Sequence, residues 1–198
     1  MPARAVVVST HSFANCGFPD TGQTVCYSTT TLSPTIPVAV LPCPVSPAYL
    51  AGQDGVYTPG AAQPSYTLHQ VSGSFVTVDN RTGLMWVTNP TDAGLGGTYD
   101  WAGAIAACES ETYAGYTDWR LPNARELESI VDYSKTAAPA INASYFQGTP
   151  VDISIYYWTS TTYAQDTTVA WVADFADGLV YHDDKANANY ARCVRAGP

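Results

Sequence analysis

The pattern of apolar and polar positions changes twice along the chain, and each change predicts a different kind of structure. From Tyr66 the pattern is that of strands, and the run SGSFVTVDNRTGLMWVTN predicts two strands joined by a turn at residues 79–83. Helical spacing follows, and beyond residue 150 four β-rich runs are separated by polar turns. This order predicts an α+β domain with two helices and a small antiparallel sheet that includes the last strand.

The first predicted helix lies in the run GLGGTYDWAGAIAACESETY. Trp101, Ile105 and Cys108 recur at i, i+4 and i+7, which predicts one buried stripe. Thr98 or Asp100 stands near the expected start of the helix, where a side-chain oxygen can accept from a free N–H group.

The second predicted helix has a clear start signal. Asn123 and Glu126 have the spacing of a capping box, in which each side chain accepts from the other residue's backbone N–H group. The core face of this helix is expected to consist of Leu127, Ile130 and Val131.

The loop before this helix, with the sequence TDWRLP, contains an arginine between rigid neighbours. Trp119 and Pro122 are expected to fix the loop. Arg120 is then expected to bind loop carbonyls or a carboxylate, either Asp118 or one from the C-terminal sheet. We interpret Arg120 as structural rather than catalytic, and we expect Trp158 and Trp171 to pack in the core.

Residues 1–65 differ in composition from the rest of the chain. They contain nine of the 14 prolines and very few charges, which is typical of extended or polyproline-like chain. We therefore divide the chain into a Pro-rich, irregular or β N-terminal extension, residues 1–65, and one domain, residues 66–198.

The charge balance limits the classes of partner. The chain has 17 acidic and only 8 basic residues, for a net charge of −9. A basic patch that could hold a nucleic-acid backbone or an anionic membrane is therefore not expected. The sequence also lacks an apolar run of the roughly 18 residues that a membrane helix needs, so we expect no membrane insertion. A surface poor in charge and rich in Ser, Thr, Asn and Tyr is typical of extracellular or cell-surface proteins.

Five cysteines stand at positions 16, 26, 43, 108 and 193, with no C-x-x-C pair. The placement of Cys108 on a helix and Cys193 in a terminal strand suggests a disulfide across the domain. Cys26 and Cys43 could close a loop in the Pro-rich segment, which leaves Cys16 free or intermolecular. Buried, reduced thiols remain the alternative reading.

The most polar part of the C-terminal half provides the candidate binding residues. Aromatic rings stack on ligands, and carboxylates and amides supply hydrogen bonds, a combination that suits sugars and protein surfaces. The candidate ligand-binding residues are Tyr163, Asp174, Asp177, Tyr181, His182, Asp183, Asp184, Asn187, Asn189 and Tyr190. We expect no cofactor; calcium is an alternative that these oxygen ligands would suit, and a solvated hairpin loop explains them equally well.

Catalysis is not expected. The three histidines are scattered outside any nucleophile motif, and Glu126 and Glu128, two apart on a helix, point to different faces. We therefore predict that the protein is not an enzyme.

Nine motifs together resemble the Lcl C-terminal domain family of exported bacterial proteins. They are DTGQTVCY, GQDGVY, VDNRTGLMW, TYDWAGAIAAC, AGYTDWRLPNARELESIVDY, PAINASYF, YYWTSTTYA, AWVADFADG and NYARCVRAG. The resemblance covers about residues 70–197, with a weaker preamble at 18–60. It implies a C-type-lectin-like fold, distantly similar to the formylglycine-generating enzyme, a Cys108–Cys193 disulfide and a binding or adhesion role.

Two family properties do not transfer directly to this chain. With 8 basic residues, it does not match the sulfated-polysaccharide binding that the namesake adhesin suggests. The calcium-sugar tripeptides of true C-type lectins are also missing from the sequence.

Three hypotheses follow for the function. The leading one is a non-catalytic extracellular module that binds a glycan or protein on another surface. The second is a structural subunit that self-associates through residues 1–65. The third is a variable binding protein of a diversity-generating retroelement, suggested by the bias of residues 154–190 to Tyr, Asn, Asp, Ser and Thr.

Overall fold

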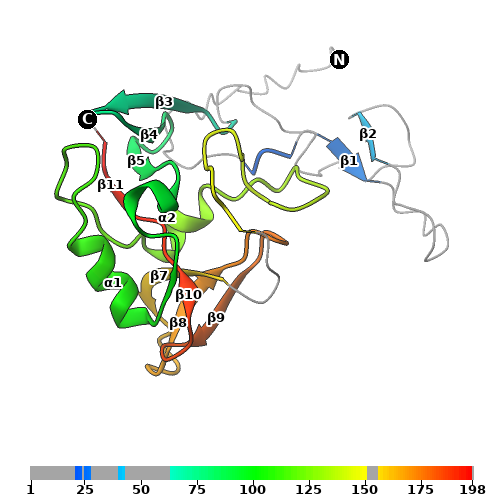
Figure 1. Cartoon of the computed structure of the whole chain (residues 1–198). Coiled ribbons are helices and arrows are strands. Elements are labelled where there is room, and N and C mark those ends of the chain that lie inside the picture. The colour runs from blue at the N-terminus through cyan, green and yellow to red at the C-terminus, as the bar shows by residue number, and fades with distance from the viewer. Residues whose placement is uncertain (1–20, 24, 28–39, 43–62, 151–155, 198) are drawn as a thin grey trace, which may run out of the picture.

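The computed structural model describes residues 21–23, 25–27, 40–42, 63–150 and 156–197. It contains two α-helices and mostly antiparallel sheets, which confirms the α+β class (Figure 1). Two short strands of the N-terminal extension, β1 (Val25–Tyr27) and β2 (Val40–Pro42), pair with each other. Cys16, Cys43 and the side chain of Cys26 lie outside the described residues, so the predicted Cys26–Cys43 pairing stays a prediction.

A four-stranded antiparallel sheet has the order β11-β5-β4-β3. Its strands are β3 (Tyr66–Val71), β4 (Ser74–Asp79), β5 (Leu84–Val87) and β11 (Val194–Ala196). The predicted turn at residues 79–83 is confirmed. The Asp79 carboxylate holds it by accepting from the Arg81 N–H group at 2.9 Å and from the Thr82 hydroxyl at 2.6 Å.

A five-stranded sheet has the order β6-β10-β7-β8-β9. Its strands are β6 (Thr98–Tyr99), β7 (Tyr157–Thr162), β8 (Val169–Ala173), β9 (Val180–Asp184) and β10 (Asn189–Tyr190). Strands β7, β8 and β9 form the expected antiparallel meander, but β10 runs parallel to β7. The prediction that the last strand completes this sheet is wrong: β11 leaves it and pairs with β5.

Helix α1 (Trp101–Glu109) begins where it was expected, with Asp100 accepting from the Gly103 N–H group at 2.6 Å. Its buried face differs in part from the prediction. Ala104 and Cys108 are fully buried, whereas Trp101 is half-buried and donates its indole N–H to the Thr159 carbonyl at 2.8 Å. The ring therefore ties α1 to β7 at the edge of the core.

Helix α2 (Ala124–Glu128) has both hydrogen bonds of the predicted capping box. It is shorter than the apolar pattern suggested. Leu127 is buried within the helix, while Ile130 and Val131 are buried in the turn that follows it. A 3-10 turn, η2 (Pro90–Ala93), precedes β6.

The core consists of two clusters on either side of the five-stranded sheet. One contains Trp158 and Val172 together with residues of α1, and the other contains Tyr157 and Ala173 together with Leu127 of α2. Since neighbouring residues of a strand point to opposite faces, β7 and β8 contribute to both clusters. The predicted burial of Trp158 is confirmed, and Trp119 is buried as well.

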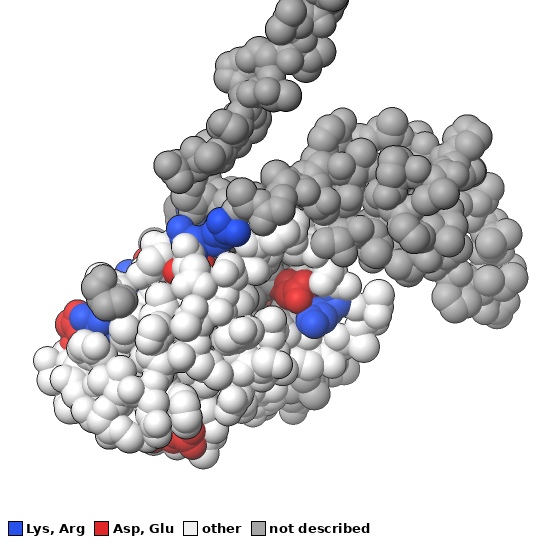
Figure 2. Space-filling view, turned by 90° about the horizontal axis from the view of Figure 1, so that it is seen from above, with Lys and Arg blue, Asp and Glu red and all other residues white. Residues whose placement is uncertain are grey.

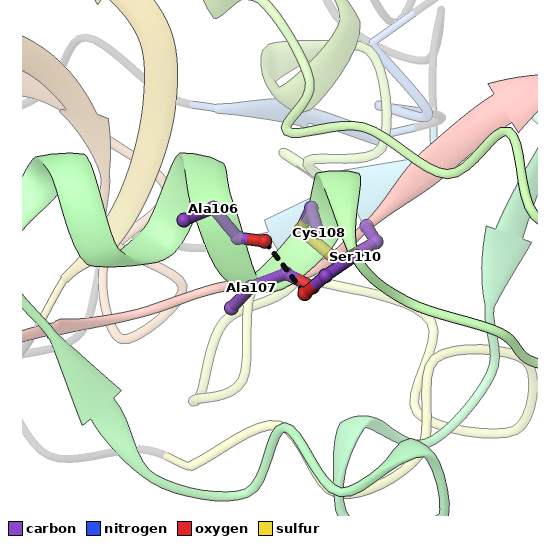
Figure 3. Close-up of a disulfide and its surroundings, with 5 residues drawn as sticks. Ala106, Ala107, Cys108 and Ser110 are labelled. Atoms are coloured by element: carbon purple, nitrogen blue, oxygen red, sulfur yellow. Dashed lines mark hydrogen bonds between the residues drawn. A yellow bond between two sulfur atoms is a disulfide. The ribbon is translucent and has the colours of Figure 1, made fainter.

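A disulfide joins Cys108, near the end of α1, to Cys193, next to β11 (Figure 3). This confirms the predicted pair. The bond spans 85 residues and lies where the chain passes from the five-stranded sheet to the four-stranded sheet. Ser110 closes the helix beside it, donating its hydroxyl to the Ala106 carbonyl at 2.8 Å.

The chain crosses from the five-stranded sheet to the four-stranded sheet at residues 192–195. These residues contact β5 and the loop before α2. Fully buried Arg192 donates from Nη1 to the Val87 and Thr88 carbonyls at 2.9 and 2.8 Å. Val194 exchanges two backbone hydrogen bonds of 2.9 Å with Arg120. Arg195 forms an ion pair of 2.6 Å with Asp118.

Arg120 is structural, but its partner was predicted wrongly. Its guanidinium makes two hydrogen bonds to the Glu126 carboxylate, at 2.8 and 2.7 Å, whereas Asp118 binds Arg195. Glu126 also accepts from the Asn123 N–H group at 2.8 Å. One carboxylate thus caps α2 and holds the arginine, with Trp119 and Pro122 buried on either side.

Replacing Cys108 and Cys193 together with serine should lower the free energy of unfolding by about 2–5 kcal/mol, because the unfolded chain regains the entropy of a long open loop. Urea unfolding of the variant and the wild type measures this loss. Each single variant should lose about as much as the pair. A loss below about 1 kcal/mol in the double variant would show that the disulfide is not a main support of the fold.

The Arg120–Glu126 pair should make stability depend on pH. Burial raises the pKa of Glu126, but the hydrogen bonds from Arg120 and Asn123 outweigh burial and hold the pKa below its ordinary value. The stabilisation is therefore complete above the unfolded-state pKa of about 4.3 and is lost as the pH falls through the lower folded-state value.

Glu126→Gln should cost about 1 kcal/mol at pH 7, because the pair is partly exposed, and almost nothing at pH 3. Urea unfolding at pH 7, 5, 4 and 3 tests this, with Glu111→Gln as the control that removes a carboxylate elsewhere. A cost that does not change between pH 7 and 3 would contradict the assignment.

Candidate ligand-binding surface

The predicted binding residues fall on both faces of the β8–β9 hairpin. In the register of these strands, Trp171 lies opposite His182 and Val172 lies opposite Tyr181. Since cross-strand partners share a face, His182 and Tyr181 point to opposite sides of the sheet. The candidates therefore form two separate groups.

Three aromatic rings form the first group, which we call the aromatic cluster: Tyr163, Trp171 and His182. The rings of Tyr163 and His182 stack, with centroids 4.6 Å apart and an interplanar angle of 14°. Trp171 meets both edge-on, at 5.2 Å from Tyr163 and 6.2 Å from His182. His182 is exposed, and the other two rings are half-buried.

The prediction that Trp171 packs in the core is therefore wrong. Its strand neighbours Ala170 and Val172 point into one core cluster, which turns Trp171 to the opposite face. There it lies toward the outer part of the hairpin, against Tyr163 and His182, while Ala173 on the same face reaches the second core cluster.

Polar side chains of the β7–β8 turn support the aromatic cluster. The Tyr163 hydroxyl donates to the side-chain carbonyl of Gln165 at 2.9 Å. The Asp166 carboxylate accepts from the Thr168 hydroxyl at 2.7 Å and from its N–H group at 2.9 Å. These bonds, with a smaller effect of His182, hold the pKa of Asp166 below its ordinary value. The turn thus presents an ionised carboxylate and an amide next to the rings.

Asp183 organises the turn between β9 and β10. Its carboxylate accepts from the side-chain amides of Asn187 at 2.8 Å and Asn189 at 2.7 Å, and from the Asp184 N–H group at 2.9 Å. Asn189 in turn accepts from the Tyr156 N–H group at 3.0 Å. Asp184 accepts from the Ala186 N–H group at 2.9 Å. These side chains stabilise the loop that they occupy.

Tyr181 lies on the other face of the hairpin. Its ring is 5.8 Å from that of Tyr156, and its hydroxyl donates to Asp177 at 2.9 Å. This bond, together with the nearby carboxylate charge, raises the pKa of Tyr181. Tyr190 is half-buried against Tyr157, at 5.4 Å between ring centroids.

Two of the predicted ligand-binding residues are buried. Asp174 is 5% exposed and Asn189 is 2% exposed. Asp174 closes a turn by accepting from the Ala176 N–H group at 2.6 Å, and burial raises its pKa. Each of the two side chains accepts a hydrogen bond from a backbone N–H group, Asp174 from Ala176 and Asn189 from Tyr156.

Each acidic side chain of this region makes its own hydrogen bonds, and the acidic side chains do not gather in one place. In the part of the chain that the structure describes, no three His, Cys, Asp or Glu side chains gather to hold a metal ion. The face seen in Figure 2 carries a few small charged patches on a broad uncharged surface, and in most of them basic and acidic side chains lie side by side. No described helix is long and apolar enough to span a membrane.

Sequence reasoning missed Trp171, Gln165 and Asp166 as members of the candidate surface. A signal for Trp171 was present, because Trp171 and Val172 are neighbours in a strand and must therefore face opposite ways. The stacking of Tyr163 on His182 joins a residue of the β7–β8 turn to a residue of β9 and had no local signal.

The fold and surface define a class: a disulfide-linked α+β domain with an aromatic cluster on one of its two main sheets. The family model described as the Lcl C-terminal domain matches residues 75–195. The chain therefore belongs to the Lcl C-terminal domain family. No curated protein matches the sequence. The C-type-lectin-like character of the fold stays a prediction.

Replacing Asp183 with alanine should loosen the β9–β10 turn, because three donors lose their shared acceptor. We expect a loss of about 1–3 kcal/mol in the free energy of unfolding and faster amide hydrogen exchange at residues 184–189. Asp166→Ala is the control, whose effect should stay within residues 166–168. Unchanged exchange at residues 184–189 in Asp183→Ala would contradict this role.

Proposed function

We propose that this protein is a non-catalytic, extracellular ligand-binding module that holds a glycan or a protein surface on its aromatic cluster. The observation that carries the proposal is the stacking of Tyr163 on His182 beside Trp171, at a place where all three rings are at least partly exposed. Such rings offer apolar contact area that loses little conformational entropy on binding.

The surroundings of the cluster suit a ligand with hydroxyl or amide groups. Gln165 and Asp166 lie on the exposed turn next to the rings, and each is already oriented by a hydrogen bond. Flat rings next to fixed polar groups can stack on the apolar face of a sugar and bind its hydroxyls. They can equally hold an aromatic or aliphatic side chain of a partner protein.

An extracellular location is supported by the disulfide. A Cys108–Cys193 bond is typical of proteins that fold in an oxidising compartment. The family assignment agrees with this location.

The proposal is tested with the folded full-length protein on glycan and protein arrays, followed by titration of the best ligand. Trp171→Ala should weaken binding by about three- to tenfold, which corresponds to the usual energy of one aromatic contact. His182→Ala should act in the same direction.

Phe75→Ala is the matched control. It removes an aromatic ring that is 47% exposed but lies on β4 of the other sheet, and it should bind like the wild type. Array signals at background, or equal losses for Trp171→Ala and Phe75→Ala, would overturn the proposal.

A further inference from the structure

The edge strand β3 is open to pairing with a further strand. It is the last strand of the four-stranded sheet (Figure 1), and in the described part of the chain it pairs with β4 alone. Residues 67–70 of this strand are exposed. The backbone N–H and C=O groups of such an edge can bind another strand that comes within reach.

The register of β3 and β4 shows which backbone groups point outward. The Asn80 N–H group donates to the Ser65 carbonyl at 2.8 Å, so Ser65 directs its backbone groups toward β4. Hydrogen-bonded and non-hydrogen-bonded pairs alternate along an antiparallel ladder. The N–H and C=O groups of Tyr66, Leu68 and Gln70 therefore point away from β4. Among the described residues these groups have no backbone partner.

The other edges of the two large sheets are short or charged. β6 has two residues and β11 has three. β9 ends with Asp183 and Asp184, and charged side chains disfavour pairing at a sheet edge. β3, in contrast, has six residues, no Asp, Glu, Lys, Arg or Pro, and a continuous register with β4. It is thus the edge of these sheets that is best suited to receive a strand.

The N-terminal part of the chain joins the domain beside the start of β3. The Thr21 carbonyl accepts from the Tyr133 N–H group at 3.0 Å. Gly22 lies against Pro64, since a Cβ atom at Gly22 would be 3.6 Å from Pro64 Cγ. Because β3 begins at Tyr66, the chain before Thr21 starts out next to the first residue of this strand.

Residues 5–10, with the sequence AVVVST, have the composition of a strand. Three of the six are valine, one is threonine, and the run contains no charged residue and no proline. Two other long segments outside the described residues, 28–39 and 43–62, contain prolines and are joined to described residues at both ends. Residues 5–10 are joined to the described residues through residues 11–20 alone, which leaves them free to lie along β3.

The link between this segment and Thr21 is long enough for such pairing. Its ten residues, 11–20, span up to about 33 Å when extended. β3 is about 20 Å long. Because Thr21 lies near the start of β3, residues 5–10 would run toward that start and so antiparallel to β3. A short link also keeps the segment at a high local concentration, which favours its own chain over a second copy.

We propose that residues 5–10 bind the open edge of β3 in the same chain, as an antiparallel fifth strand of the four-stranded sheet. The outward N–H and C=O groups of Leu68 and Gln70 then gain partners, and the Leu68 side chain, 36% exposed, gains an apolar neighbour. The bound segment covers the edge and thereby prevents two copies from pairing through it. The proposal does not depend on the aromatic cluster, which lies on the other sheet.

Amide hydrogen exchange of the full-length protein, followed by NMR residue by residue, tests the proposal. The Leu68 and Gln70 amides should exchange at least about tenfold more slowly than exposed loop amides, although β4 does not bind them. NOEs between backbone protons should connect residues 5–10 with residues 66–71.

Val7→Pro and Val8→Pro, made separately in the full chain, remove the proposed strand's hydrogen bonds. Neighbouring residues of a strand direct their N–H groups to opposite sides, so one of the two prolines removes a bond to β3. In at least one variant, exchange at Leu68 and Gln70 should therefore become about tenfold faster or more.

The amides of Thr67 and His69, which face β4, should keep their exchange rates in both variants. Thr30→Pro is the matched control, because it places a proline in another segment of the N-terminal extension. It should leave exchange along the whole of β3 unchanged.

Three results would overturn the proposal. The first is fast exchange of the Leu68 and Gln70 amides in the wild type. The second is slow exchange that persists in both Val7→Pro and Val8→Pro, or NOEs that connect β3 to a different segment. The third is protection that rises with protein concentration together with a dimer in sedimentation, which would show that a second copy occupies the edge.

Discussion

The crossing between the two sheets at residues 192–195 is the constraint on which the rest of the structure depends. Within four residues the chain leaves the five-stranded sheet, forms a disulfide to α1 and enters the four-stranded sheet beside β5. Arg192 binds carbonyls at the end of β5, and Val194 pairs with the backbone of Arg120. This segment therefore links both sheets to α1 and to the loop before α2.

Hydrogen bonds connect the same crossing to the hairpin that carries the aromatic cluster. Asn189 of β10 accepts a hydrogen bond from the Tyr156 N–H group and donates one to the carboxylate of Asp183, which lies near the end of β9. The β8–β9 hairpin is thus fixed through β7 and β10 to the crossing. The strand period puts Trp171 and His182 on the same face of this hairpin, where both are at least partly exposed.

Local features of the fold were predictable from the sequence because their energies come from neighbouring residues. The capping box of Asn123 and Glu126 and the turn at residues 79–83 depend on side chains within three positions. The disulfide was also predictable, because the family resemblance and the placement of Cys108 and Cys193 agreed.

Long-range choices were not predictable in the same way. The expected partners of Arg120 were loop carbonyls, Asp118 or a carboxylate of the C-terminal sheet. Arg120 binds Glu126 instead, because the capping box already places this carboxylate beside the guanidinium. The last strand joined β5 rather than the meander, a choice that depends on packing between segments about a hundred residues apart. Asp174 and Asn189 were predicted to be surface ligands because they are polar. Both are buried, since the backbone N–H groups of nearby loops need acceptors inside the protein.

The use of the basic residues narrows the chemistry of any external ligand. Among the described residues, Arg81 donates to the Gln63 carbonyl, and Lys185 lies 3.9 Å from the Trp101 ring centroid and donates to Thr162. Arg120, Lys135 and Arg195 are in ion pairs, and Arg192 is buried. Most of the few positive charges therefore bind the protein itself, while the chain keeps a net charge of −9. An anionic ligand would meet repulsion with little to offset it, so the aromatic cluster is better suited to a neutral or basic partner held by stacking and hydrogen bonds.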